Sequence, residues 1–266
     1  MVESRHFLQA NISAVARHKA FNSNGTVRIG VVIPCRGDAQ LLPKCLMSLS
    51  DFIAASERVV VVNADHSPAT AAVAAGAGVE VINSDKPDRG RAVAAGIAHL
   101  LFRASTAPDV VLIAHADMEF APESRKVLIL AIGSNARWHW GALGHHISSP
   151  LWRFRVVEAG NSLRASRFQT PYGDQAMFFG VDALETSGGF PQQNTMEDFE
   201  LALRLKAIVP PLYINYPVRI SDRHWRRGVS HASARNWFTA INYLMSRTEL
   251  RVAGRVTTTV HRPVGI

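Results

Sequence analysis

The stretch VVLIAHADMEF (Val110–Phe120) decides the fold class. Its first five residues are apolar without alternation, which is typical of a strand that is buried on both faces of a parallel sheet. The apolar run stops abruptly at His115, Ala116 and Asp117. Ligands of open α/β sheets bind beyond the carboxyl ends of the strands, where a carboxylate can share Mg²⁺ or Mn²⁺ with substrate phosphates. We therefore predict an α/β fold in which Asp117 is a metal ligand.

Strands and helices alternate upstream of this strand. Runs of β-branched residues predict strands, and apolar residues at helical spacing predict helices. The expected strands are 29–33, 58–62 and 79–82, and the expected helices are 39–49, 69–77 and 91–102. This alternation indicates βαβ units and therefore a doubly wound, mostly parallel sheet.

The second half of the chain is less regular. It contains a strand-like run (138–147), an arginine-bearing helix (151–168), an acidic helix, a last strand (218–220) and a basic tail. We predict one domain over 27–266, with a nucleotide-binding half to about 118, an acceptor and catalytic half over about 119–240, and a tail to 266. Residues 1–26 are expected to add one helix.

Composition excludes several classes of protein. The sequence has 266 residues, 47% of them hydrophobic, and no apolar run long enough for a membrane span or a secretory leader, so we expect a cytoplasmic protein. Cys35 and Cys45 are too few for a disulfide framework and are expected to be buried. The net charge of +8 favours anionic ligands. The basic residues lack the interleaved aromatics of nucleic-acid binding, but they leave peripheral membrane contact through the tail open.

A pair of carboxylates, Glu197 and Asp198, begins the acidic helix behind a turn that contains Gly188 and Gly189. Acids in the first turn of a helix are also favoured by the exposed backbone N–H groups, so the pair alone is not diagnostic. Together with Asp117 it predicts a general base beside a metal site.

Polar residues follow each of the first strands. Because the strand ends of a doubly wound sheet converge on one crevice, these residues are expected to lie close together. They comprise acids suited to a nucleoside and arginines suited to phosphates, namely Asp38, Asn63, Asp65, Asp88, Arg89, Arg91 and Asp117.

Other motifs do not fit a site. His139, His145 and His146 lie in a strand-like run without partners at zinc-ligand spacing. Gly76 and Gly78 precede a strand, whereas a dinucleotide-binding loop precedes a helix. We find neither a P-loop lysine motif nor a nucleophile elbow.

The sequence resembles family 2 glycosyltransferases with the GT-A fold over residues 28–237. The resemblance rests on six segments in the family's order: VVIPCRGDAQLLPKCLMSL, DRGRAVAAGIAHL, IAHAD, YGDQAMFF, GGFPQQNTMEDFELALRLK and DRHW. It is closest to a bacterial subgroup of short members with HAD, YGDQ and MED motifs. The family implies a Rossmann-like sheet with a specialised acceptor-side second half.

The resemblance also implies an activity and a set of site residues. The activity is an inverting sugar transfer from a nucleotide-diphosphate sugar, for which we expect a UDP-sugar, to a hydroxyl acceptor, with Mn²⁺ or Mg²⁺ at Asp117. Asp198 would be the general base and Glu197 its support. The nucleotide and donor side would comprise Pro34, Asp38, Asn63, Asp65, Arg89, Arg91, Ala116, Asp117, Gly173, Asp174 and Gln175. The phosphate and acceptor side would comprise Arg223, His224 and Trp225.

The chain departs from the family pattern at three positions. Asn63 replaces the usual aspartate at the end of the second strand, which puts the base of the donor in question because an amide carries no charge. Asp65 is the residue that can compensate. Ala94 replaces an asparagine and His224 an arginine.

Two other functions stay open. A sugar-nucleotide nucleotidyltransferase would use a similar sheet and metal but attack at phosphorus. A non-catalytic nucleotide-sugar binding protein would fit the change at Asn63. No feature of the sequence points to an acceptor or to an oligomeric state.

Overall fold

The computed structural model describes residues 27–55, 57–102, 107–135, 139–225 and 238–247. The chain forms two compact units, Met1–Ser221 and Asp222–Ile266. The described part of the second unit consists of a short 3₁₀ turn, η2 (Asp222–Trp225), and a helix over 238–247. The helix expected within residues 1–26 and most of the basic tail lie outside the described residues. The predicted domain boundaries stay a prediction.

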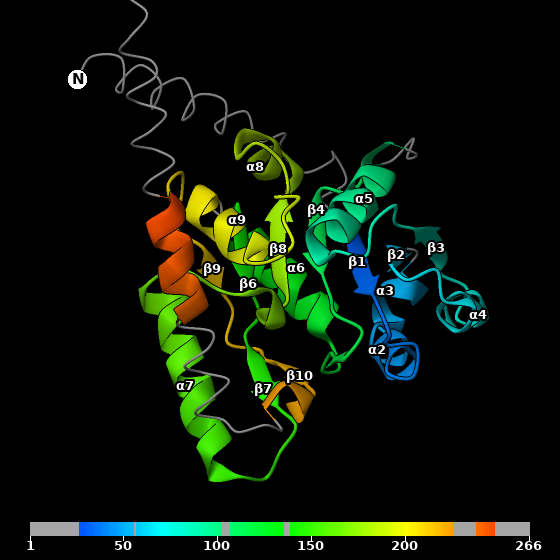
Figure 1. Ribbon diagram of the computed structural model, residues 1–266, viewed down its shortest axis with the longest axis horizontal. Coiled ribbons are helices and arrows are strands. Elements are labelled where there is room, and N and C mark those ends of the chain that lie inside the picture. Colours follow the sequence, from blue (N-terminus) through cyan, green and yellow to red (C-terminus); the bar gives the residue numbers. More distant parts are fainter. Residues whose placement is uncertain (1–26, 56, 103–106, 136–138, 226–237, 248–266) are drawn as a thin grey trace, which may run out of the picture. The chain divides into compact units, whose positions relative to one another are not determined.

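A seven-stranded sheet forms the centre of the first unit (Figure 1). Its order is β3-β2-β1-β4-β8-β6-β9. The strands are β1 (Ile29–Cys35), β2 (Arg58–Asn63), β3 (Glu80–Asn83), β4 (Val110–Ile113), β6 (Trp140–Ala142), β8 (Met177–Gly180) and β9 (Leu212–Tyr213). The first four strands pair in parallel, whereas β8 runs antiparallel to both β4 and β6. The predicted α/β fold with a mostly parallel sheet is confirmed, and β4 is buried throughout as its composition predicts.

A second sheet of three strands contains β5 (Met118–Glu119), β10 (Val218–Ile220) and β7 (His145–Ile147). The strand-like run expected over 138–147 is therefore divided between the two sheets. The division falls at Gly144, whose φ of 81° is a conformation that few other residues adopt.

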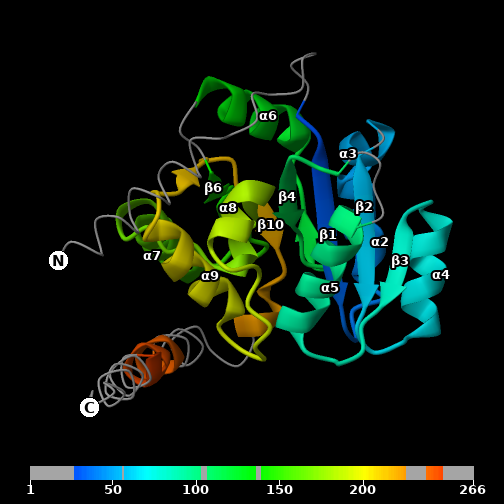
Figure 2. The same cartoon turned by 90° about the horizontal axis from the view of Figure 1, so that it is seen from above.

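Helices surround the sheet, and α4 lies beside β3 at one edge (Figures 1 and 2). The helices are α2 (Leu42–Ser48), α3 (Ser50–Ala54), α4 (Pro68–Gly76), α5 (Arg89–Phe102), α6 (Ser124–Ser134), α7 (Trp152–Arg167), α8 (Val181–Thr186) and α9 (Glu197–Lys206). The helix expected from Ala39 begins only at Leu42, because the Asp38 carbonyl accepts hydrogen bonds from the Leu41 and Leu42 N–H groups in a preceding turn. We did not predict α6 or α8 from the sequence.

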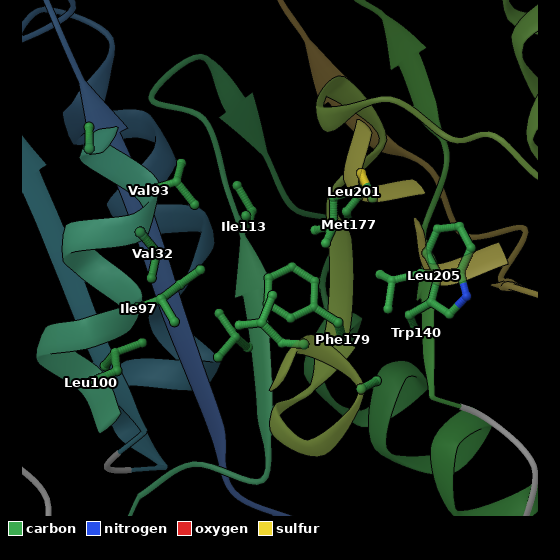
Figure 3. Close-up of a cluster of buried hydrophobic side chains, with 14 of the residues drawn as sticks. Val32, Val93, Ile97, Leu100, Ile113, Trp140, Met177, Phe179, Leu201 and Leu205 are labelled. Carbon is green, nitrogen blue, oxygen red and sulfur yellow. The ribbon is translucent and has the colours of Figure 1, made fainter. Parts of the chain in front are cut away.

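A cluster of buried hydrophobic side chains joins α5 and α9 to the sheet (Figure 3). Val93 and Ile97 of α5 pack against Val32 of β1, and Leu201 and Leu205 of α9 belong to the same cluster. Burial of each such side chain contributes roughly 1.5–3 kcal/mol of transfer free energy. This shared cluster therefore fixes α5, which begins with Arg89, and α9, which begins with Glu197, to the same sheet.

In the part of the chain that the structure describes, no helix is both long and apolar enough to cross a membrane.

Candidate active site

Three of the segments that the sequence singled out meet around Gly173. This glycine begins η1 (Gly173–Gln175), and its N–H donates to Asp198 Oδ2 at 2.6 Å. A Cβ on Gly173 would lie 3.0 Å from Asp198 Oδ2 and 3.2 Å from His115 Nε2. Both distances are tight for a side chain, so glycine lets the end of β4, η1 and the start of α9 approach closely.

Arg89, the first residue of α5, adds a fourth segment to this site. Its Nε donates to Glu197 Oε1, and its Nη2 donates to Asp198 Oδ2 at 3.2 Å. The Glu197 side chain is only 2% exposed, whereas those of Asp198 and Arg89 are 14% and 42% exposed. Asp198 can therefore meet a substrate, while Glu197 is confined to its contact with Arg89.

The backbone ahead of α9 is shaped for this contact. Gly188 and Gly189 have φ values of 88° and 80°, in agreement with the predicted turn, and Met196 just before Glu197 has a φ of 60°. A Cβ on Gly90 would lie 2.3 Å from the carbonyl oxygen of Gln193. The start of α5 thus packs directly on the loop that leads into α9.

Burial and neighbouring charges shift the pKa values of Glu197 and His115. Burial raises the pKa of Glu197 above its ordinary value; Arg89 opposes this shift and the charge of Asp198 reinforces it. Burial lowers the pKa of His115 to about 4, and the positive charge of Arg89 acts in the same direction. The His115 ring is therefore neutral at pH 7.

Arg164 of α7 fastens the segment that contains η1. Its guanidinium Cζ lies 3.5 Å from the centroid of the Tyr172 ring, and its nitrogens donate to the Thr170 carbonyl and, at 3.3 Å, to Gln175 Oε1. Tyr172 in turn packs edge-on against Phe199 of α9, with ring centroids 5.7 Å apart. Stacking and hydrogen bonding by one arginine therefore tie α7, η1 and α9 together.

Asp174 and Gln175 retain hydrogen-bonding capacity. Asp174 Oδ2 lies 3.5 Å from Nδ1 of His145 on β7. Burial would raise the pKa of Asp174, but the charges of His145 and Arg164 outweigh it and hold that pKa below its usual range. Asp174 Oδ1 and Gln175 Nε2 are buried and find no hydrogen-bond partner among the described residues. A polar ligand would satisfy both atoms, since buried polar groups are normally bonded.

The carboxyl ends of β1 and β2 are joined by Asp65, whose Oδ2 accepts from the Gly37 N–H at 2.7 Å. Asn63 is 2% exposed, and its amide is bonded to the backbone of Ser67, accepting at 2.9 Å and donating at 3.0 Å. The exposed Asp65 is therefore better placed than Asn63 to face a ligand.

The remaining predicted residues have diverse surroundings. Arg91 is ion-paired to Asp88 at 3.4 Å, and Pro34 is half-buried near the end of β1. Asp38 is half-buried in the turn after β1. Ala116 is buried between the two polar residues that follow β4. Arg223, His224 and Trp225 belong to the second unit, and the structure describes only the backbone of His224 and Trp225.

Asp117 follows β4 and is half-buried. Among the described residues, no group of three or more histidine, cysteine or acidic side chains could hold a metal ion by itself. A single carboxylate oxygen donor at the sheet edge fits Mg²⁺ or Mn²⁺, because these ions are commonly bound by one or two carboxylates together with substrate phosphates. The site fits a metal that is shared with the substrate.

Three residues of the site were not in our predicted set. His115 lies in the quoted IAHAD motif, so its place after β4 was a usable signal. Arg164 and His145 gave none, because four arginines occupy Leu151–Phe168 and nothing local shows which of them reaches Tyr172.

A family described as "Glycosyl transferase family 2" matches residues 30–181, more than half of the chain. No curated protein sequence matches the chain.

Solved structures share the fold at low sequence identity. S. aureus TarS 1-349 has a TM-score of 0.58 and 15% identity, over 74% of this chain and 61% of its own. The mannosyltransferase PcManGT from Pyrobaculum calidifontis, in complex with GDP-Man and Mn²⁺, has a TM-score of 0.55 and 20% identity, over 85% of this chain and 68% of its own. Glucosyl-3-phosphoglycerate synthase from Mycobacterium tuberculosis, in complex with Mn²⁺, UDP and glucosyl-3-phosphoglycerate, has a TM-score of 0.51 and 15% identity, over 78% of this chain and 74% of its own. The chain spans about three fifths of TarS 1-349.

Proposed function

This chain belongs to glycosyl transferase family 2, and we propose that it transfers a sugar from a nucleotide-diphosphate sugar to a hydroxyl acceptor. One observation carries the proposal. The end of β4, η1 and the start of α9 converge on the contact between the Gly173 N–H and Asp198 Oδ2, 2.6 Å apart. A candidate metal ligand, a candidate donor segment and a candidate base thus lie on one edge of the sheet.

The donor is proposed to bind at the ends of β1, β2 and β4. Asp65 offers an exposed carboxylate for the nucleoside, and Asp174 and Gln175 offer unsatisfied polar atoms for the hydroxyls of the sugar. The structures of PcManGT with GDP-Man and of TarS 1-349 with UDP-GlcNAc support a nucleotide sugar as donor. We expect UDP as its nucleotide.

Asp117 is proposed to hold Mn²⁺ or Mg²⁺ together with the diphosphate. When bound, the metal would stabilise the negative charge that develops on the leaving diphosphate. The exposed part of Arg89, with Arg91, would add positive charge on the same side. Arg223, His224 and Trp225 are proposed for the phosphate or acceptor side.

Asp198 is proposed as the general base. The acceptor hydroxyl attacks the anomeric carbon from the face opposite to the leaving diphosphate, so one base suffices and the configuration is inverted. As the hydroxyl oxygen forms its bond to the anomeric carbon, its proton passes to a carboxylate oxygen of Asp198. Glu197 is too buried to meet the acceptor and acts as a positioning residue through Arg89.

Product analysis tests this proposal against its alternatives. The protein is incubated with Mn²⁺ and a panel of nucleotide sugars, with water, a hydroxyl acceptor or pyrophosphate as nucleophile. Attack at the anomeric carbon by water or a hydroxyl gives a nucleoside diphosphate, whereas attack at phosphorus by pyrophosphate gives a nucleoside triphosphate and a sugar phosphate. The proposal predicts the diphosphate with an inverted sugar. Release of the triphosphate would identify a nucleotidyltransferase, and tight binding without turnover on the whole panel with any of these nucleophiles would identify a binding protein.

The finer assignments rest on the sequence. Membership of the subgroup with HAD, YGDQ and MED motifs, a cytoplasmic location and membrane contact through the basic tail all stay proposals.

A further inference from the structure

Helix α7 exposes several apolar side chains, whereas an ordinary surface helix exposes mainly polar ones. On its inner side, beside the buried Phe154 and Ala165, polar side chains bond to the protein. Arg155 donates to the Ile147 carbonyl at 2.7 Å, and Glu158 accepts from the Ile147 N–H at 2.5 Å. Asn161 bonds to His145 at 3.2 Å, and Arg164 holds the segment before β8. Figure 1 shows α7 alongside β7.

The outer side of α7 is apolar. Trp152, Val156 and Leu163 are 77%, 61% and 57% exposed. At about 100° per residue these three side chains and Ala159 fall within about 60° of the helix circumference, so they form one continuous stripe. Leu151 and Phe168, which flank α7 in the sequence, are also exposed. A contiguous exposed apolar patch of this kind marks an interaction surface.

The charged side chains around this stripe indicate which kind of partner it can bind. Arg153 and Arg167 are exposed at opposite ends of α7, and Lys206 donates to the Phe168 carbonyl at 3.2 Å. The single carboxylate of α7, Glu158, is bonded on the inner side. A second copy packed antiparallel along the stripe would bring Arg153 against the partner's Arg167, and parallel packing would also oppose like charges. The surface is complementary to an anionic partner.

We propose that α7 docks the protein on an anionic lipid bilayer. Trp152, Val156 and Leu163 enter the boundary between acyl chains and headgroups, and Arg153 and Arg167 contact lipid phosphates. An apolar stripe with a tryptophan and flanking arginines is the arrangement that binds membrane interfaces. This surface is separate from the basic tail and does not depend on the sugar-transfer reaction.

Vesicle co-sedimentation of the whole chain tests the proposal. The parent protein should sediment with phosphatidylcholine vesicles that contain phosphatidylglycerol, and much less with phosphatidylcholine alone. Val156→Ser combined with Leu163→Ser should weaken the partitioning about tenfold, because the apolar area that enters the bilayer is lost. Arg153→Gln and Arg167→Gln should each weaken it about fivefold at low salt.

Leu130→Ser in α6 is the matched control, because this leucine is also on a helix and is 61% exposed. It should leave the partitioning unchanged. Thermal unfolding of all variants should match the parent, since the substituted side chains are exposed. The proposal is wrong if the parent binds both vesicle types equally, if the doubly substituted stripe binds like the parent, or if the parent is a dimer that the stripe substitutions dissociate without vesicle binding.

Discussion

At the residue scale, Asp198 and Glu197 are neighbours in sequence with different surroundings. Both contact Arg89, but Glu197 is 2% exposed and Asp198 is 14% exposed and bonded to Gly173. The sequence indicated that one of the pair is a base and favoured Asp198 through the family resemblance. The structure supports the proposed assignment, because the side chain of Asp198 is the more exposed of the two.

Asp198→Asn should retain donor affinity and lose transfer. An amide cannot accept the acceptor proton, and removal of a general base costs on the order of a hundred- to ten-thousand-fold in rate. The measurement is the rate of nucleoside diphosphate release together with calorimetry of the donor. If donor affinity falls while turnover per bound donor stays normal, Asp198 is a binding residue.

Asn63 and Asp65 separate two interpretations of the nucleoside contact. In the sequence, Asn63 stands where the family has an aspartate, and Asp65 is the residue that can compensate. The structure shows the Asn63 amide donating to the Ser67 carbonyl, a bond that aspartate cannot make. We now expect Asn63→Asp to cost about 1–3 kcal/mol of stability with an unchanged ratio of UDP to GDP and CDP affinity. Asp65→Asn should change that ratio. If the ratio changes with Asn63→Asp and not with Asp65→Asn, Asn63 is the residue that contacts the base.

Asp174 should contribute stability that depends on pH. Its folded-state pKa lies below the ordinary value, so its contribution is present above the unfolded pKa of about 4 and is lost as the pH falls toward the folded pKa. Urea unfolding at a series of pH values should show a steeper acid loss for the parent than for Asp174→Asn. The difference in slope is at most about 1.4 kcal/mol per pH unit. Equal slopes would mean that the contact between Asp174 and His145 contributes nothing to stability in this pH range.

At the scale of elements, the strand and helix rhythm of the first half could be predicted because each element carries its own signal. β1, β2, β4 and α5 all appear where their composition places them. The second half could not be predicted as well, because β6 and β7 share one sequence run and pair in different sheets. Pairing between distant segments, such as that of β8 with β4, has no local signature.

The contact between α5 and the loop before α9 can be tested by adding a single methyl group at Gly90 and measuring the stability of the protein. Gly90→Ala should place its Cβ against the carbonyl oxygen of Gln193 and cost about 1–3 kcal/mol, because backbone must move to make room. Gly160→Ala in α7 is the control, since nothing lies within 4 Å of its added Cβ. It should stabilise the protein by about 0.5–1 kcal/mol. Urea unfolding measures both variants, and equal midpoints for Gly90→Ala and the parent would contradict the packing.

At the scale of the whole molecule, the family, the fold and the convergence of quoted motifs could be anticipated from the sequence. The interactions that hold the site together could not, because Arg164 reaches Tyr172 from a helix whose spacing reveals no target. Neither could the outward stripe of α7, which depends on which side of the helix faces β7.

The central claim is that this fold binds a nucleotide-diphosphate donor with a metal at Asp117. The most direct test is calorimetry of the protein against a panel of nucleoside diphosphates with and without Mn²⁺, repeated with Asp117→Asn. We predict that at least one nucleoside diphosphate binds more tightly with Mn²⁺ than without it, and we expect UDP to be that nucleotide. Asp117→Asn should remove this gain in affinity and leave the thermal unfolding of the protein unchanged. Equal Mn²⁺-dependent affinity in parent and variant, or no nucleotide binding by the parent, would contradict the claim.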